Sequence, residues 1–135
     1  MSLIKTIDFP PLGDHRGHLV ALEANITVPF DIKRVYYLFD TKEGIARGFH
    51  AHKNLKQVAL CVKGSCRFVL DNGRRKESIV LDKATTGLLI EGLVWREMHE
   101  FSPDCVLLVL ASEHYDEADY IRDYQQFLEE VNGKN

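Results

Sequence analysis

The sequence predicts an all-β fold, an antiparallel β-sandwich or jelly roll that ends in a short α-helix. Short runs rich in β-branched and aromatic residues recur along the chain, each bounded by turn residues. No helical pattern lies between these runs, which favours antiparallel sheets over strands joined by crossover helices. Only the last part of the chain has apolar residues at steps of three and four, the spacing of an amphipathic helix.

The strands are expected in chain order from near the N-terminus. Each run is followed within two residues by Gly, Pro, Asp or Ser, which are residues typical of turns. The expected strands are residues 4–9, 32–39, 58–62, 66–70, 78–81, 87–90 and 106–110. Gly64 lies between the third and fourth of these strands and predicts a hairpin there.

The C-terminal segment, residues 116–131, is expected to be a helix that follows a core of residues 4–112. One face of this helix would carry four apolar residues, Ile121, Tyr124, Leu128 and Val131. Asp116 or Asp119 would cap its start, and Gly133 would end it. We expect the apolar face to pack on the outside of the sandwich, with docking of a partner as the alternative.

Length and composition describe one globular domain, residues 1–135. Apolar residues make up 45% of the chain and charged residues 27%, and the net charge is −3. The lack of a basic block argues against binding to nucleic acid or to anionic membranes. The longest apolar run, residues 105–111, is too short to cross a bilayer, and no signal peptide is recognisable. Three cysteines without a disulfide spacing indicate reduced thiols and a cytoplasmic protein.

Two histidines two residues apart form the most informative local pattern, in residues 47–57 (RGFHAHKNLKQ). The spacing resembles the first motif of the cupin superfamily at Gly44, His50, His52, Gln57 and Gly64. Cupins have glutamate where this chain has Gln57. Because residues i and i+2 of a strand point to the same face, we expect His50 and His52 to point together into the barrel. Two surface histidines are the alternative.

By the same resemblance, the second cupin motif lies in residues 92–99 (GLVWREMH). Metal-binding cupins complete their site with the glutamate and a third histidine, and Arg96 holds the position of that histidine. A guanidinium cation cannot ligate a metal ion, and the Gln57 amide is a weaker ligand than a carboxylate. His99 is an odd number of residues from Arg96, so it faces the other way on a strand. We predict a site without metal and without any other cofactor.

Two inward histidines in a metal-free cavity suit proton transfer, because imidazole has an ordinary pKa of about 6.5. Cationic residues accompany them in the motifs described so far and in the segment DHRG, namely Arg16, Arg47, Lys53 and Arg96. The planar forks of arginine bind anions and match a diphosphate well. The sequence therefore predicts an anionic small-molecule substrate.

Five segments together resemble the dTDP-sugar 3,4-ketoisomerase family, namely residues 14–20 (DHRGHLV), 32–37 (IKRVYY), 47–53 (RGFHAHK), 92–98 (GLVWREM) and 111–122 (ASEHYDEADYIR). The likeness extends over most of the chain. It implies a cupin-type fold and an isomerase that converts dTDP-4-keto-6-deoxyglucose into a dTDP-3-keto-6-deoxyhexose, a precursor of 3-amino-3,6-dideoxyhexoses. The implied chemistry is proton transfer between C3 and C4, for which no cofactor is needed.

The resemblance also implies roles for individual residues. The segment RGFH is similar to RGxH of the dTDP-sugar 3,5-epimerases, in which the histidine is a base. His50 is therefore expected to move the C3 proton, with His52 as its partner. Tyr37 is expected to line the pocket or to supply a phenol proton, and a core aromatic is the alternative. The expected substrate-binding residues are Arg16, Arg47, Lys53, Gln57 and Arg96.

The family resemblance further implies a homodimer. Pro10 and Pro11 end the first strand and extend the chain away from its own body, which favours an exchange of N-terminal strands between subunits. Trp95 is expected in the core, and His15, His18 and His114 on the surface. Three other functions stay open: a dTDP-sugar 3,5-epimerase, a metal-dependent cupin enzyme, and a non-catalytic cupin that binds a sugar nucleotide.

Overall fold

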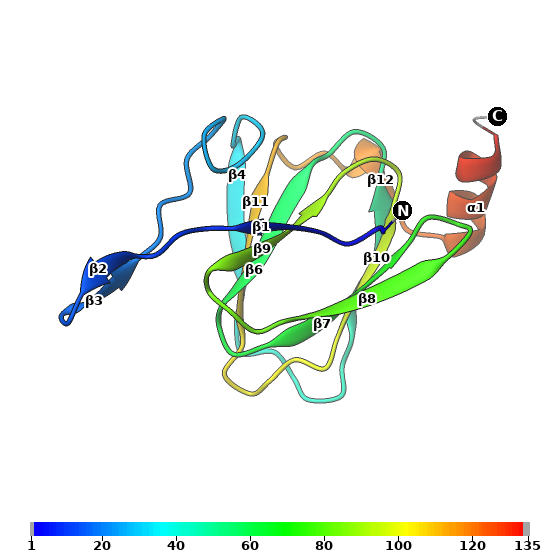
Figure 1. The fold of residues 1–135 in the computed structure, drawn as a ribbon. Helices are drawn as coiled ribbons and strands as arrows, with labels where there is room; N and C mark the ends of the chain where they lie inside the picture. Colours follow the sequence, from blue (N-terminus) through cyan, green and yellow to red (C-terminus); the bar gives the residue numbers. More distant parts are fainter. Residues whose placement is uncertain (1, 134–135) are drawn as a thin grey trace.

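Two antiparallel sheets of five strands each pack face to face in the computed structural model, which describes residues 2–133. The strand order is β1-β9-β6-β11-β4 in the first sheet and β12-β5-β10-β7-β8 in the second (Figure 1). Side chains from both sheets fill the space between them, including Ala59, Phe68 and Leu107. The predicted all-β sandwich with a C-terminal helix is confirmed.

The first sheet consists of β1 (Lys5–Asp8), β9 (Thr86–Ile90), β6 (Gln57–Lys63), β11 (Val106–Ala111) and β4 (Arg34–Leu38). The second consists of β12 (Tyr120–Ile121), β5 (Arg47–His52), β10 (Trp95–His99), β7 (Cys66–Asp71) and β8 (Lys76–Leu81). The other elements are β2 (Leu12–Asp14), β3 (Gly17–Leu19), the 3-10 helix η1 (Glu117–Asp119) and α1 (Tyr124–Asn132). All the strands expected from composition are present, each within two residues of its expected bounds.

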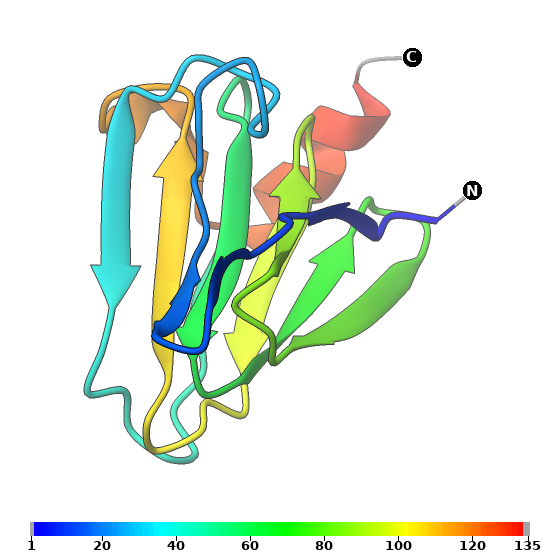
Figure 2. The ribbon, with the colours of Figure 1, turned by 60° about the vertical axis from the view of Figure 1, so that its left-hand side comes forward.

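A hairpin of β2 and β3 lies away from the sandwich (Figure 1) and comes forward in Figure 2. Leu12 and Leu19 face each other across it, and each is more than half exposed. The sequence did not reveal this hairpin because strands of three residues are too short for a hydrophobic period to be recognised. The two short strands carry apolar side chains out to solvent.

The expected helix over residues 116–131 was wrong in its first half. Asp116 caps the short helix η1, its side chain accepting a hydrogen bond from the Ala118 N–H. The chain then becomes extended, because β12 pairs with β5 and buries Ile121 opposite Ala51. Only after this strand does α1 begin, with Asp123 as its N-cap and Gly133 as its C-cap. Pairing at the sheet edge thus overrode the helical spacing of Ile121.

Helix α1 packs on the outer face of the second sheet, as expected (Figure 2). Phe127 is fully buried there against Trp95, whose predicted place in the core is confirmed. The outer face of the first sheet is covered in part by the segment after β3, which contributes Val28 and Phe30 to a second apolar cluster. Among the described residues, no helix is both long enough and apolar enough to cross a membrane.

Candidate active site

Strand β5 carries both motif histidines on its inner face. The His50 and His52 rings lie nearly perpendicular, with their centroids 4.9 Å apart. His52 is only 1% exposed, whereas His50 is half-buried and lines a cavity. The shared orientation is the one expected from their spacing, and the difference in depth gives the two rings different surroundings.

A bulge in β5 sets the direction of these side chains. Gly48 and Phe49 both have positive φ, 92° and 60°. The pairing with β10 skips Phe49, since His50 is opposite Arg96 and Gly48 is opposite Glu97. Left-handed backbone is uncommon for a residue other than glycine and is concentrated at functional sites. The bulge turns Phe49 outward, against His99, and leaves both motif histidines facing the interior.

A chain of hydrogen bonds crosses from β10 to β4 below the histidines. The Arg96 Nη1 donates to Gln57 Oε1 at 2.7 Å, and Gln57 Nε2 donates to the Tyr36 hydroxyl at 2.8 Å. Arg96 Nη2 also donates to the Val94 carbonyl at 2.9 Å. The guanidinium thus occupies the interior position expected for it. Because the Tyr36 oxygen accepts from Gln57, its own hydroxyl proton is free for another acceptor.

Burial keeps the two histidines neutral. Desolvation, followed by the positive charge of Arg96, lowers the pKa of His50 to about 4 and that of His52 to about 2. Burial lowers the pKa of Arg96 only to about 10, so Arg96 stays a cation at neutral pH. Burial also raises the pKa of Tyr36, which keeps the phenol protonated. The site therefore offers unprotonated imidazoles, a phenol donor and a fixed positive charge.

The cavity beside His50 has a volume of about 350 Å³. It is lined by Arg34, Tyr36, Leu38, Arg47, Gly48, His50, Met98, Tyr115, Tyr120 and Arg122. The Arg34 guanidinium lies over the Tyr36 ring at 5.3 Å, and that of Arg122 lies over the Tyr120 ring at 4.2 Å. Three arginines around one cavity favour an anion, and stacking on aromatic rings orients two of them. Arg122 is also paired with the Glu117 carboxylate, which offsets part of its charge.

The FdtA family model, described as WxcM-like, C-terminal, matches residues 2–132 of this chain. The chain belongs to the FdtA family. Over 123 residues it is 56% identical to the TDP-4-oxo-6-deoxy-alpha-D-glucose-3,4-oxoisomerase of Aneurinibacillus thermoaerophilus, a match that covers 91% of this chain and 88% of that protein. The family resemblance stated from the sequence motifs is confirmed.

Two solved structures are similar to this FdtA-family chain over nearly its whole length. One is a histidine-to-asparagine mutant of the 3,4-ketoisomerase QdtA from Thermoanaerobacterium thermosaccharolyticum in complex with TDP-4-keto-6-deoxyglucose. It has a TM-score of 0.95 and 44% identity, and covers 99% of this chain and 97% of QdtA. The other is a 3,4-ketoisomerase from Helicobacter canadensis, with a TM-score of 0.93, 50% identity and coverage of 96% and 97%.

Tyr37 was the wrong tyrosine to place in the pocket of this FdtA-family protein. Side chains alternate along β4, so Arg34 and Tyr36 face the interior while Val35 and Tyr37 face outward. Tyr37 is 61% exposed, which also excludes the alternative of a core aromatic in this chain. Both faces of β4 carry apolar residues, so composition did not reveal which of two adjacent tyrosines points inward.

The expected substrate-binding residues of the FdtA-family site are only partly brought together. Arg47 lines the cavity, while Gln57 and Arg96 are buried and do not line it. Arg16 lies in the β2–β3 turn, where its 80% exposed side chain pairs with Asp14, and it does not line the cavity of its own chain. Lys53 is exposed in the turn after β5 and does not line the cavity.

Sequence reasoning assigned no role to Arg34 or Arg122, although both belong to segments that carry the family resemblance. Arg34 lies two residues before Tyr36, and a correct phase for β4 would have placed it on the same face. Arg122 directly follows β12, an element that the helical interpretation concealed. His99 does face away from Arg96, as expected, and its Nε2 is 2.9 Å from Glu97 on the outer face. His15, His18 and His114 are exposed, as expected.

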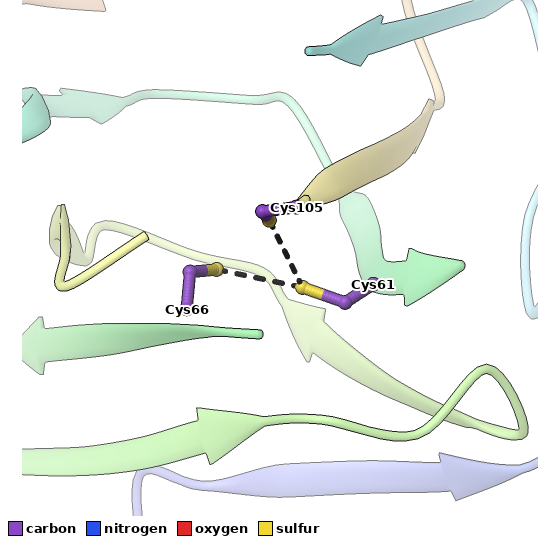
Figure 3. A group of neighbouring side chains, drawn as sticks. All are labelled: Cys61, Cys66 and Cys105. Atoms are coloured by element: carbon purple, nitrogen blue, oxygen red, sulfur yellow. Dashed lines mark hydrogen bonds between the residues drawn. The ribbon is translucent and has the colours of Figure 1, made fainter. Parts of the chain in front are cut away.

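The three cysteines meet at the other end of the interior of this FdtA-family fold. Cys61 Sγ lies 3.6 Å from Cys66 Sγ and 3.7 Å from Cys105 Sγ (Figure 3). All three sulfurs are within 4.8 Å of one another, near enough to share a soft metal ion. The contact with Cys66 and burial raise the pKa of Cys61, and burial raises the pKa of Cys105 to about 12. Neutral thiols packed in an apolar cluster behave as small core residues.

Proposed function

We propose that this chain is a sugar-nucleotide 3,4-ketoisomerase that converts dTDP-4-keto-6-deoxyglucose into a dTDP-3-keto-6-deoxyhexose. The observation that carries the proposal is the pair of buried, neutral histidines next to a cavity lined by three arginines. The QdtA mutant that holds TDP-4-keto-6-deoxyglucose superposes on this chain with a TM-score of 0.95, which supports the same class of ligand here.

The reaction needs two net proton transfers, from C3 to C4 and from O3 to O4, and no change in oxidation state overall. The C4 ketone acidifies the C3–H bond; when a base takes that proton, the C–H electrons form a C3=C4 bond and the carbonyl oxygen becomes an enolate. Protonation of that oxygen gives an enediol. Loss of the O3 hydroxyl proton then forms the C3 ketone, while C4 takes up a proton. No redox cofactor is needed for this series of steps.

His50 is assigned the transfer between C3 and C4. It lines the cavity and is neutral at pH 7. Tyr36 is assigned protonation of the enolate oxygen, because its hydroxyl proton is not used by Gln57. The fixed charge of Arg96 lies close enough to lower the pKa values of both histidines, so it also stabilises negative charge that develops on oxygen.

The diphosphate of the substrate is assigned to Arg34, Arg47 and Arg122. All three line the cavity, and guanidinium forks bind phosphate oxygens in pairs. The fork of Arg122 already holds the Glu117 carboxylate, so Arg122 must exchange this partner for the phosphate or contribute its charge alone. This assignment replaces Lys53, and it removes Arg16 from the binding site of its own chain. Metal is not part of the proposal, because the Arg96 cation holds the position of a cupin ligand and is hydrogen-bonded to the position of another, Gln57.

The deciding experiment is incubation with dTDP-4-keto-6-deoxyglucose in D2O, followed by proton NMR. Loss of the C3 proton with a new 3-keto product supports the proposal, and deuterium appears at C4 to the extent that the histidine proton exchanges with solvent. Loss of the C5 proton instead indicates a 3,5-epimerase. Binding of dTDP without any exchange indicates a non-catalytic cupin, and turnover abolished by a chelator and restored by a metal indicates a metal-dependent enzyme.

We also propose a homodimer in which N-terminal hairpins are exchanged. Leu12 and Leu19 of the projecting hairpin are exposed, and so are Val35, Tyr37 and Phe39 on and next to the outer face of β4. Such apolar patches at the surface are typical of interfaces. A hairpin laid across a second copy would cover this apolar surface and would carry Arg16 away from its own sandwich toward the other subunit.

Mixed dimers test this exchange more sharply than mass alone. Sedimentation should give a dimer at micromolar concentration, and a monomer would contradict the proposal. Arg16→Ala and His50→Asn homodimers are each expected to be impaired. If Arg16 acts in the neighbouring subunit, co-expressed mixed dimers contain one site with both substitutions and one intact site, and activity is regained. No recovery in mixed dimers would place Arg16 in the site of its own subunit, and an unimpaired Arg16→Ala homodimer would place it outside the site altogether. The cytoplasmic location stays a prediction, to be checked by cell fractionation.

A further inference from the structure

Asp119 contacts His52, the more deeply buried of the two motif histidines. One of its carboxylate oxygens, Oδ2, is 3.2 Å from His52 Nδ1. The other, Oδ1, accepts hydrogen bonds from the backbone N–H groups of Asn54 at 2.8 Å and Lys53 at 3.2 Å. The Asp119 side chain is 14% exposed, so these contacts are largely removed from solvent. The turn after β5 and the helix η1 thus hold the carboxylate in a fixed place.

The hydrogen bond fixes which nitrogen of His52 carries the proton. A carboxylate only accepts, so Nδ1 must be the N–H that donates to Asp119. In a neutral ring the lone pair then lies on Nε2. This nitrogen is buried and has no hydrogen-bond partner within the described part of the chain. The ring that carries it packs against His50 and Tyr120, which line the reaction cavity. An unsatisfied buried polar atom costs free energy, so its presence here calls for a function.

We propose that Asp119 is a positioning residue that holds His52 as the Nδ1–H tautomer, so that Nε2 accepts the O3 hydroxyl proton during isomerisation. This inference rests on the proposed function. In that step the O3–H bond breaks, its electrons form the C3 carbonyl, the proton moves to Nε2, and the C3=C4 electrons take at C4 the proton that His50 removed from C3. His52 then gives its proton to solvent, and Tyr36, which protonated O4, takes one up, so both groups return to their starting forms. His50 and His52 then serve different atoms of the sugar. Asp119 takes up no proton and touches no reacting atom.

The surroundings of His52 suit this division of work. The Tyr120 ring packs on His52 with its centroid 4.3 Å away and also contacts His50 at 5.1 Å, so one aromatic ring fixes both imidazoles. Burial first, and then the positive charges of Arg96, Arg34 and Arg122, lower the pKa of His52 and disfavour imidazolium in the resting enzyme. Developing negative charge on the sugar reverses this balance, and Asp119 then stabilises the imidazolium that forms.

The substitution Asp119→Asn tests the role of Asp119 in fixing the His52 tautomer while it leaves the packing around residue 119 nearly unchanged. The amide oxygen of asparagine still accepts from the Asn54 and Lys53 N–H groups, so the turn is kept. The amide nitrogen now faces His52 Nδ1 as a donor, which makes Nδ1 the acceptor and moves the ring proton to Nε2. The lone pair is lost from the interior while shape and volume stay nearly the same. We expect kcat to fall roughly 10²–10⁴-fold, with KM little changed.

A matched control and a direct readout complete the test. Asp123→Asn keeps an oxygen at the N-cap of α1 and should change neither kcat nor the His52 tautomer. Long-range ¹H–¹⁵N NMR reports which ring nitrogen is protonated; we expect Nδ1–H in the wild-type protein and Nε2–H in Asp119→Asn. Wild-type protein with its proton on Nε2 overturns the inference, and this measurement needs no variant.

A wild-type rate in Asp119→Asn with the inverted tautomer also overturns it, because the position of the lone pair would then be irrelevant. Failure of the proposed function has a different signature. Wild-type protein that leaves dTDP-4-keto-6-deoxyglucose unchanged removes the role in catalysis, whereas the tautomer measurement, made without substrate, still tests the structural half of the inference.

Discussion

Ionisable groups are buried near both ends of β6, but their hydrogen bonding differs between the two ends. Gln57, Ala59 and Cys61 alternate along the strand and are all buried. Near Gln57, buried nitrogens of His50, His52 and Arg96 have no hydrogen-bond partner among the described residues. Near Cys61, three sulfurs contact one another inside an apolar cluster. Among the buried ionisable side chains of residues 2–133, nitrogens without a hydrogen-bond partner distinguish the end that carries chemistry.

Burial moves the pKa values at both ends toward the neutral form, with opposite consequences. It lowers the pKa of His50 to about 4, and a neutral imidazole is the form that accepts a proton. It raises the pKa of Cys105 to about 12, and a neutral thiol is the unreactive form. Burial therefore keeps the histidines in the form that accepts a proton, although it weakens them as bases, and it keeps the thiols in their unreactive form.

The largest expected effect is at the histidine end. His50→Asn keeps a polar side chain but removes the base, so kcat should fall ~10²–10⁴-fold. Binding of dTDP should survive, because the three arginines of the cavity are untouched; calorimetry with dTDP checks this. Wild-type turnover in His50→Asn would remove His50 from the mechanism and leave His52 as the only imidazole assigned to proton transfer.

The pH dependence of stability should also come from the histidine end. Below the ordinary value of 6.5 an unfolded chain takes up a proton on each histidine, but folded His50 does so only near pH 4 and folded His52 only near pH 2. Stability is therefore complete above pH 6.5 and falls as pH falls, by about 1.4 kcal/mol per pH unit for each neutral histidine. Urea unfolding of wild type and of His50→Asn/His52→Asn between pH 6.5 and about 5, above the carboxylate range, should show a flatter profile in the variant.

The same values predict the activity profile of the free enzyme. kcat/KM should stay on its plateau through pH 6.5 and decline only toward pH 4, where His50 takes up a proton. An acid limb centred near 6.5 would contradict the assignment of a desolvated His50 as the base.

A pair of adjacent tyrosines gives the next effect. Tyr36→Phe removes the proposed donor and leaves the Gln57 amide without its acceptor, so turnover should fall by roughly tenfold to a hundredfold. Tyr37→Phe is the matched control, since its hydroxyl faces outward and the ring is kept for the interface. Kinetics of both variants decide between the tyrosine expected from the sequence and the one that the fold selects.

Much of the fold follows from local sequence, but the assembly of the site does not. Composition and turn residues were enough to place seven of the twelve strands of the described residues, and the spacing of His50 and His52 gave their common face. The phase of β4 depended on which apolar face meets the core, which two adjacent tyrosines did not reveal. The left-handed backbone conformation of Phe49 and the pairing of β12 with β5 depend on tertiary contacts. Asp119 was hidden for the same reason, because it meets His52 only after the chain returns to β5.

The smallest effect on activity is expected at the cysteine end. Cys61 lies four residues from Gln57 along β6, roughly 13 Å at the rise of a strand. Cys61→Ala removes one buried sulfur and its contacts, which should lower the free energy of unfolding by about 1–2 kcal/mol, less than a typical Leu→Ala change. Cys61→Ser should cost more, because a hydroxyl is more strongly desolvated in an apolar cluster than a thiol. Urea unfolding gives the stability of both variants, and kcat should match wild type. A fall in kcat without a loss of stability would mean that the cysteine end takes part in function after all. Unpaired nitrogens of buried ionisable side chains would then not mark the functional end of β6.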